Sequence, residues 1–353
     1  MWRVSTFWMP VAVLWRGMSE ISRTDTASAA ERQASGGVSN FIGILCVMGA
    51  VTTFSINDVL IKFLSAGYPL HQITFIRGIV ACAFALFLFM PLEGGWRNLK
   101  TARWKFHLLR GSTVVIANMV FFTGLAALPL GEATAIYFVG PLFITALSFF
   151  ILGERVGPRR WTAVVIGLIG VVIVIRPGAT TFQLAAILPA LAAFFYASLQ
   201  IMTRKLGTTE KASTMTFYIN LSFIFYSGMI GLVFGDGRYS GWDSASLEFL
   251  TRPWIWPTPH DWILLLAVGV LISFGAYFVS QAYRSCEAGL LAPFEYVALP
   301  QAVIFSVVFF GEWPDAIAWI GIVLIALAGL YVFIRETMLG RAAKWKLPLP
   351  RNK

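Results

Sequence analysis

The chain has 353 residues, of which 58% are hydrophobic and 12% charged, and its formal net charge is +10. Soluble globular domains have roughly 45–50% apolar and about 25% charged residues, so this composition excludes an ordinary soluble protein and indicates a membrane protein. The positive charge need not mean a nucleic-acid partner, because membrane proteins also gather basic residues in their cytoplasmic loops. No nucleic-acid partner is therefore expected.

Ten apolar runs of about 20 residues, each long enough to cross a ~30 Å hydrocarbon core as a helix, follow one another along the chain. They are predicted at 40–66, 70–91, 106–127, 132–152, 160–176, 181–203, 213–235, 261–283, 288–310 and 315–335. The prediction is an all-α integral membrane protein with ten transmembrane helices. Residues 1–39 are expected to form a disordered tail, with Met18 as the expected true start, and 337–353 a basic tail.

The basic residues predict the orientation of these spans. Of the 27 Lys and Arg residues, 21 lie in the two tails and in the loops on the same side as the tails, whereas Arg176, Arg238 and Arg252 lie on the opposite side. Basic loops are retained in the cytoplasm. Both termini are therefore expected in the cytoplasm, and the one long external loop is predicted at 236–260. The predicted location is a bacterial inner membrane, so the lipid bilayer is an expected partner.

Two pairs of similar segments indicate an internal duplication. FSINDVLIKFL (54–64) resembles YASLQIMTRKL (196–206), and LGERVGPRRW (152–161) resembles FGEWPDAIAW (310–319). A unit of five crossings ends on the far side of the membrane, so a second copy must insert upside down. The sequence predicts two inverted five-helix repeats, in which arginines remain only in the copy of the Gly-Glu motif that faces the cytoplasm. The predicted motif residues are Pro141, Gly153, Glu154, Pro300, Gly311 and Glu312.

This ordered, duplicated set of motifs resembles the drug/metabolite transporter superfamily, EamA type, over residues 40–336. The repeats would be 40–178 and 181–336. The resemblance implies an inverted-repeat bundle with a substrate cavity near the midplane and alternating access, an architecture that is also physically reasonable. Members of the superfamily move amino acids, sulfonium compounds such as S-adenosylmethionine, riboflavin, sugars and drugs, inward or outward.

Two charges inside predicted spans are the main candidates for substrate binding, because a charge at a helix centre costs about 2.5–3.5 kcal/mol on insertion scales. Arg77 suits a carboxylate or phosphate, although a structural pairing with Asp58 or with carbonyls is an equal alternative. Glu295 lies between Pro293 and Pro300, whose missing donors free carbonyls near the carboxylate, so it could hold a cation or a proton. Its alternative is a kink packed against a neighbouring helix.

Other intramembrane residues have more modest expected roles. Asp58 and Lys62 are spaced i, i+4 on one helix face, which favours a structural ion pair or a part in coupling. Polar and aromatic residues at mid-span positions suggest the remaining cavity wall. They are Asn118, Tyr137, Tyr196, Gln200, Tyr277, Gln281 and Tyr296.

Several absences narrow the function. The chain has no GxxxxGK[ST] loop, and its three histidines and three cysteines show no metal-ligand spacing, so no cofactor, no metal and no ATP-driven pumping are expected. Any coupling would use protons or another ion. A polytopic enzyme for lipid-linked substrates would need clustered acidic, histidine or metal-ligand residues, which are not seen, so an enzyme is not expected.

The predicted function is secondary transport of a small polar metabolite. Arg77 and Glu295 favour a zwitterion such as an amino acid or an amino-acid derivative. If both charges are paired internally, a neutral vitamin such as riboflavin becomes the better prediction.

Overall fold

The computed structural model describes residues 29–92, 95–99, 101, 104–153, 157–176, 184–206, 212–285 and 294–345. Within these ranges every regular element is a helix and none is a strand, which confirms the all-α prediction. The expected start at Met18 and the loop residue Glu154 lie outside the described residues. Two helices extend into the segments predicted as tails, since the first begins at Ala29 and the last ends at Trp345.

The helices follow the predicted runs in order. The first half contains α2 (Ala29–Leu64), α3 (Leu70–Phe84), the π-helix η3 (Ala85–Phe89), α4 (Met90–Leu92), η4 (Trp96–Leu99), α5 (Trp104–Leu125), α6 (Leu130–Tyr137), α7 (Gly140–Leu152) and α8 (Pro158–Ile175). The second half contains η5 (Leu184–Ala186), α9 (Ile187–Leu206), α10 (Ala212–Phe234), α11 (Ala245–Thr251), α12 (Pro259–Ser285), α14 (Ala298–Phe310) and α15 (Ala316–Trp345).

Seven segments of the described chain are long and apolar enough to cross a membrane. Three further apolar helices are shorter: Trp161–Ile175, Ala298–Phe310 and Ala316–Val332. Large apolar side chains such as Phe87, Phe150 and Leu232 are at least 70% exposed, as expected where lipid rather than water covers the surface. The protein is therefore a multi-pass membrane protein, and each of the ten predicted runs overlaps at least one described helix, although only seven segments of the described chain are of spanning length.

The duplication is visible in backbone geometry. The fourth predicted run is divided into α6 and α7, with Pro141 in the first turn of α7; α14 likewise begins after a turn at 296–297 and carries Pro300 in its first turn. Proline is tolerated there because the first-turn N–H groups have no intrahelical partner. α7 and α14 each have 13 residues and end at Gly153 and Gly311, both with φ of 67°. This left-handed conformation suits glycine.

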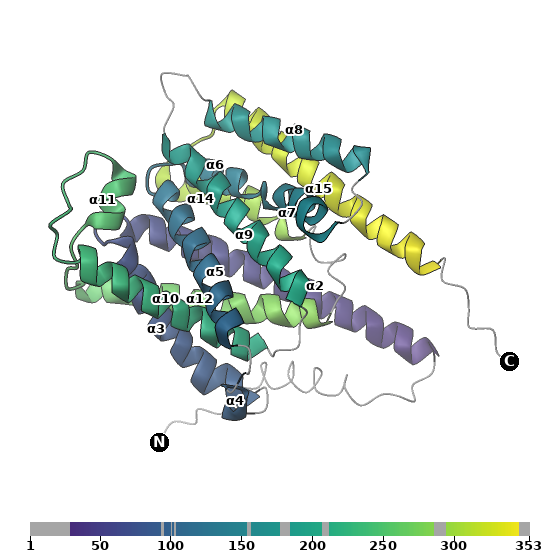
Figure 1. Cartoon of the computed structure of the whole chain (residues 1–353), viewed down its shortest axis with the longest axis horizontal. Coiled ribbons are helices and arrows are strands. Elements are labelled where there is room, and N and C mark those ends of the chain that lie inside the picture. Colours follow the sequence, from purple (N-terminus) through teal and green to yellow (C-terminus); the bar gives the residue numbers. More distant parts are fainter. Residues whose placement is uncertain are drawn as a thin grey trace.

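Helices of the first half pack mainly against helices of the second. The pairs are α2 with α12, α3 with α10, α5 with α9, α6 with α14 and α8 with α15. α8 and α15 lie side by side along one side of the bundle (Figure 1). Their backbones meet at Gly170 and Gly321, where a Cβ on Gly321 would lie 2.7 Å from the Gly170 carbonyl oxygen. Small residues allow such close approach between membrane helices.

One end of the bundle is covered by residues 235–258, called here the cap segment, which includes α11 (Figure 1). Arg252 donates to the Ser65 carbonyl at 3.0 Å, and Ser246 donates to the Thr123 carbonyl at 2.7 Å. These bonds tie the cap segment to the ends of α2 and α5. We call this the cap end of the molecule.

Candidate substrate site

Arg77 lies in the middle of α3 and is 2% exposed. Its Nη2 donates to the Asn118 side-chain oxygen at 2.8 Å, and its guanidinium carbon lies 4.7 Å from the ring centroid of Phe223 and 5.8 Å from that of Phe122. Cation–π contacts and one charge-assisted hydrogen bond stabilise the charge in part. Among the described residues, Nη1 has no hydrogen-bond partner. The described contacts therefore satisfy the buried guanidinium only in part.

Asp58 of α2 is the carboxylate in electrostatic range of Arg77. It accepts a hydrogen bond from the Asn57 side-chain amide at 3.1 Å, and Tyr137 also lies within its electrostatic range. The side chain keeps an intermediate exposure within the bundle. Asp58 therefore faces the same interior region as Arg77, as the structural alternative for Arg77 expects, but no direct bond joins the two among the described contacts.

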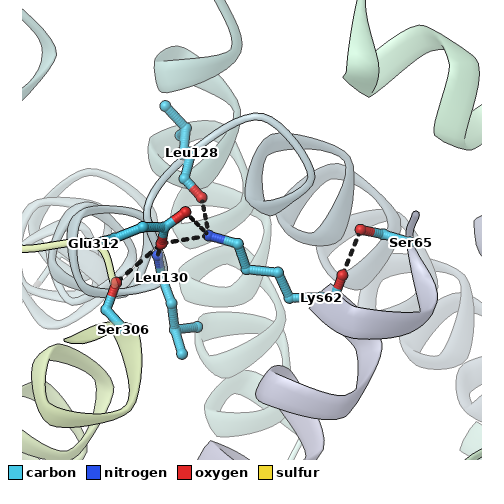
Figure 2. A network of polar contacts seen from close by, with 6 residues as sticks. All are labelled: Lys62, Ser65, Leu128, Leu130, Ser306 and Glu312. Carbon is cyan, nitrogen blue, oxygen red and sulfur yellow. Dashed lines mark hydrogen bonds and ion pairs between the residues drawn. The ribbon is translucent and has the colours of Figure 1, made fainter. Parts of the chain in front are cut away.

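The expected pairing of Asp58 with Lys62 is not the one found. Lys62 pairs instead with Glu312, at 2.6 Å from Nζ to Oε2. An i, i+4 pair contributes only about 0.2–0.5 kcal/mol, so a partner from the segment between α14 and α15 that completes several hydrogen bonds displaces it. Lys62 also donates to the Leu128 carbonyl at 2.8 Å (Figure 2).

A row of aromatic rings continues from Asp58 toward Glu295. The Phe121 and Tyr137 centroids are 5.0 Å apart, and those of Tyr137 and Tyr196 are 5.9 Å apart. Gln200 donates to the Tyr196 hydroxyl at 2.8 Å, and Glu295 lies in electrostatic range of both tyrosines. Five predicted site residues therefore come together here with Arg77 and Asp58: Asn118, Tyr137, Tyr196, Gln200 and Glu295. We call these seven residues the central row.

Three other predicted wall residues are not placed in the central row. Tyr296 packs on Phe138, with ring centroids 5.3 Å apart, and its hydroxyl points at α15, 1.9 Å from the position that a Cβ on Gly329 would take. Tyr277 stacks on Phe89 at 4.3 Å. The side chain of Gln281 lies outside the described residues.

Gln301 is a polar residue between α14 and α2 that sequence reasoning missed. From α14 it donates to the Thr52 hydroxyl and accepts from the Ser55 hydroxyl, both at 3.1 Å, so it joins α14 to α2. The available signal was an amide directly after Pro300 in an otherwise apolar run. It did not stand out because its partners are about 250 residues away in sequence.

A second charged group gathers at the cap end. Besides the Lys62–Glu312 pair, Arg176 forms an ion pair with Asp315, and its Nη1 donates to Asp315 Oδ2 at 2.7 Å. Glu132, in the first turn of α6, lies in electrostatic range of all four charges. Each ion pair joins the first half of the chain to the second. Within the described ranges, no three His, Cys, Asp or Glu side chains gather in a way that could hold a metal ion.

Residues 41–176 and 183–334 each match the family described as EamA-like transporters. The chain belongs to this family. Two copies of the EamA domain in one chain confirm the resemblance to the drug/metabolite transporter superfamily. The family also confirms that the protein is a transporter and not an enzyme.

Relatives within the family are named as transporters of different substrates. The riboflavin transporter of Vibrio cholerae is 29% identical over 85% of this chain and 95% of its own length. The S-adenosylmethionine uptake transporter of Rickettsia prowazekii is 30% identical over 83% and 93%, and the pseudopaline exporter of Pseudomonas aeruginosa is 24% identical over 81% and 94%. A solved crystal structure matches 88% of this chain and 99% of its own, with a TM-score of 0.56 at 18% identity, and so shares the fold. The common feature is transport of a small metabolite across a membrane.

Proposed function

We propose that this protein transports a small zwitterionic or cationic amino-acid derivative, such as a sulfonium compound, across a bacterial inner membrane. The observation that carries the proposal is the central row, which includes Arg77, whose Nη1 has no hydrogen-bond partner among the described residues, and Glu295, which lies in electrostatic range of Tyr137 and Tyr196. A substrate carboxylate would bind the guanidinium, since such charge-assisted bonds are stronger than neutral ones. The positive group of the substrate would bind near Glu295, and Tyr137 and Tyr196 would contact its apolar body.

The proposed arrangement has ten spans in two inverted five-helix repeats with both termini in the cytoplasm. The distribution of basic residues supports this orientation, and it puts the cap end outside. In the proposed mechanism the two halves rock about the central row, so that it opens alternately to each side. Protons or another ion are the proposed driving force, because the chain has no phosphate-binding loop.

The similarity to an S-adenosylmethionine uptake transporter supports this substrate class. A neutral vitamin such as riboflavin is the second candidate. The aromatic contacts among Phe121, Tyr137 and Tyr196 favour it, as does the similarity to a riboflavin transporter. Planar rings stack on such side chains without needing either charge.

The test is a thermal-shift series on detergent-purified protein, because a ligand that binds the folded state raises its melting temperature. S-adenosylmethionine is compared with S-adenosylhomocysteine, which lacks the sulfonium charge, with methylthioadenosine, which lacks the amino-acid part, and with riboflavin. We expect the largest shift with S-adenosylmethionine and a smaller one with each truncated compound. A shift with riboflavin alone would replace the first candidate by the second.

Charge-removing substitutions connect this ligand series to the site. Arg77→Gln is expected to weaken binding of carboxylate-bearing ligands by about 10- to 100-fold, since a hydrogen bond to a charged group contributes about 1.5–3 kcal/mol. It should leave methylthioadenosine unaffected. Glu295→Gln should reduce discrimination between S-adenosylmethionine and S-adenosylhomocysteine. Equal loss for all four ligands would show that these charges are structural.

A further inference from the structure

The Lys62–Glu312 ion pair bridges the two halves of the protein at the cap end. Lys62 Nζ lies 2.8 Å from Glu312 Oε1 and 2.6 Å from Oε2, and the two side chains are 10% and 32% exposed. Lys62 comes from α2 in the first repeat, whereas Glu312 directly follows the glycine that ends α14 in the second. Separation of the two halves at this end must therefore break the pair.

Groups from the α5–α6 connection, from α6 and from α14 make further hydrogen bonds to the two charges of the ion pair (Figure 2). Lys62 Nζ also donates to the Leu128 carbonyl, and Glu312 Oε2 accepts from the Leu130 amide at 3.3 Å and from the Ser306 hydroxyl at 3.1 Å. The Leu130 amide belongs to the N-terminus of α6, whose dipole favours a carboxylate. Each charge thus has several partners while the ends of α2, α6 and α14 are held together.

The pair lies between an outer hollow and the central row. Lys62 lines a hollow of about 470 Å³ between the end of α2 and the cap segment, together with Phe63, Trp242 and Arg252. On the other side, Asp58 of the central row lies one helical turn deeper along α2. The ion pair therefore occupies the boundary between the cap-end solvent and the candidate substrate site.

An apolar contact reinforces this boundary. The Phe63 and Phe310 rings are 4.7 Å apart, and Lys62 Nζ lies 4.6 Å from the Phe310 ring centroid. These contacts also join α2 to α14. The rings therefore add an apolar contact between the two helices beside the ion pair.

We propose that Lys62 and Glu312 form the outer gate of the transport pathway. The proposal rests on the proposed function, because a gate requires a substrate to pass. A zwitterionic or cationic substrate fits this gate, since its carboxylate can replace Glu312 at Lys62 and its positive group can replace Lys62 at Glu312. The substrate thereby offsets the loss of the pair when the gate opens, whereas removal of one partner leaves a partly buried charge without its ion-pair partner.

Thiol labelling in membrane vesicles tests the gate without requiring transport. Thr52→Cys serves as a reporter, because Thr52 lies on α2 about 15 Å deeper than Lys62 at 1.5 Å per residue and contacts Gln301 of α14. It is introduced after Cys46, Cys82 and Cys286 are changed to serine. A membrane-impermeant thiol reagent is added to right-side-out and to inside-out vesicles, and the labelling rate is measured for each.

We expect Lys62→Gln and Glu312→Gln each to raise the labelling rate in right-side-out vesicles by about tenfold. This factor is the increase in the population of the outward-open state when the closed state is destabilised by about 1.4 kcal/mol. The exchange variant Lys62→Glu/Glu312→Lys should bring labelling back toward the parent rate without reaching it, because it restores the ion pair but places the new carboxylate beside the Leu128 carbonyl and the new ammonium group beside the Leu130 amide. Arg238→Gln, which removes an exposed pair with Asp236, is the control and should change nothing.

Unchanged labelling in both single variants, with normal amounts of protein in the membrane, would overturn the gate. If the single variants do not reach the membrane, Lys62→Gln/Glu312→Gln removes both charges together, and a parent-like labelling rate in it would equally overturn the gate. Failure of every candidate ligand to bind would overturn the proposed substrate but leave the labelling result unaffected, so the two failures are distinguishable.

Discussion

Arg77 and Asn118 are joined by a hydrogen bond of 2.8 Å from the guanidinium to the side-chain amide oxygen, across the contact between α3 and α5. This bond satisfies one side of a guanidinium whose Nη1 has no partner among the described residues. Asn118 therefore sets the direction in which the other side of Arg77 points. We propose that it positions the anion-binding group.

Asn118→Ala is expected to lower both stability and carboxylate recognition. Loss of the acceptor leaves a buried charged donor unsatisfied, which costs about 1–3 kcal/mol or more. The measurements are the melting temperature in detergent and the shifts produced by S-adenosylmethionine and methylthioadenosine. Asn220→Ala is the control, because the Asn220 side chain bonds only within its own helix, to the Thr216 carbonyl, among the described contacts. Equal effects of the two substitutions on ligand selectivity would contradict the role of Asn118.

Gly329→Ala is expected to disturb the turn at 296–297, which directly follows Glu295. An added Cβ would lie 1.9 Å from the Tyr296 hydroxyl and 2.8 Å from its Cζ, so the ring must move. Transport should fall, and Tyr296→Phe in the same protein should restore part of it by removing the closest atom. Gly67→Ala, where an added Cβ meets nothing within 4 Å, is the matched control. No recovery in the double variant would mean that the tyrosine ring is not the cause.

Gly153→Ala and Gly311→Ala are expected to destabilise the protein by similar amounts, roughly 1–2 kcal/mol each, because both glycines have φ of 67° and end equivalent helices. Melting temperatures give the comparison. Gly311→Ala should in addition raise thiol labelling at Thr52→Cys, since Glu312 follows directly. A large difference in stability between the two variants would contradict their structural equivalence.

The cap segment is expected to keep its structure in mildly acidic medium. Hydrogen bonds from the backbone N–H groups of Gly241 and Trp242 hold the pKa of Glu248 below its usual value. A carboxyl group whose pKa is lowered by folding stabilises the folded state at pH values above its unfolded-state pKa of about 4.3. This stabilisation is lost only as the pH falls through the lower folded-state pKa. Amide protection of Gly241 and Trp242 in hydrogen exchange should therefore be the same at pH 7 and pH 5.

Glu248→Gln should reduce that protection at both pH values, because it removes the charge that both amides contact. Asp243→Asn, the same change of charge in the same segment, is the control and should leave protection unaffected. A loss of protection in the unchanged protein between pH 7 and pH 5 would contradict the lowered pKa.

The sequence by itself determined the membrane class, the all-helical fold and the duplication. Apolar runs of spanning length leave the backbone no partner except itself, so helices are required. Pro141 and Pro300 lie at similar distances before Glu154 and Glu312, which is a mark of the duplication, and the structure shows a helix break beside each proline that the continuous run predicted at 132–152 did not include. The sequence also made Arg77 a candidate site residue, because a charge inside an apolar run is costly and is expected to be paired or functional.

Tertiary structure decided which charges meet. Local spacing favoured an ion pair between Asp58 and Lys62. Lys62 pairs instead with Glu312, 250 residues away, because the packing of α2 against α14 brings this carboxylate to it. The Leu130 amide and the Ser306 hydroxyl also donate hydrogen bonds to the Glu312 carboxylate. The direction of Tyr296 toward Gly329 was likewise set by the packing of α15. Sequence spacing shows which side chains are neighbours on one helix. A charge inside the bundle, however, pairs with the group that best completes its ion pair and hydrogen bonds, and only the packing of the helices decides which side chain that is.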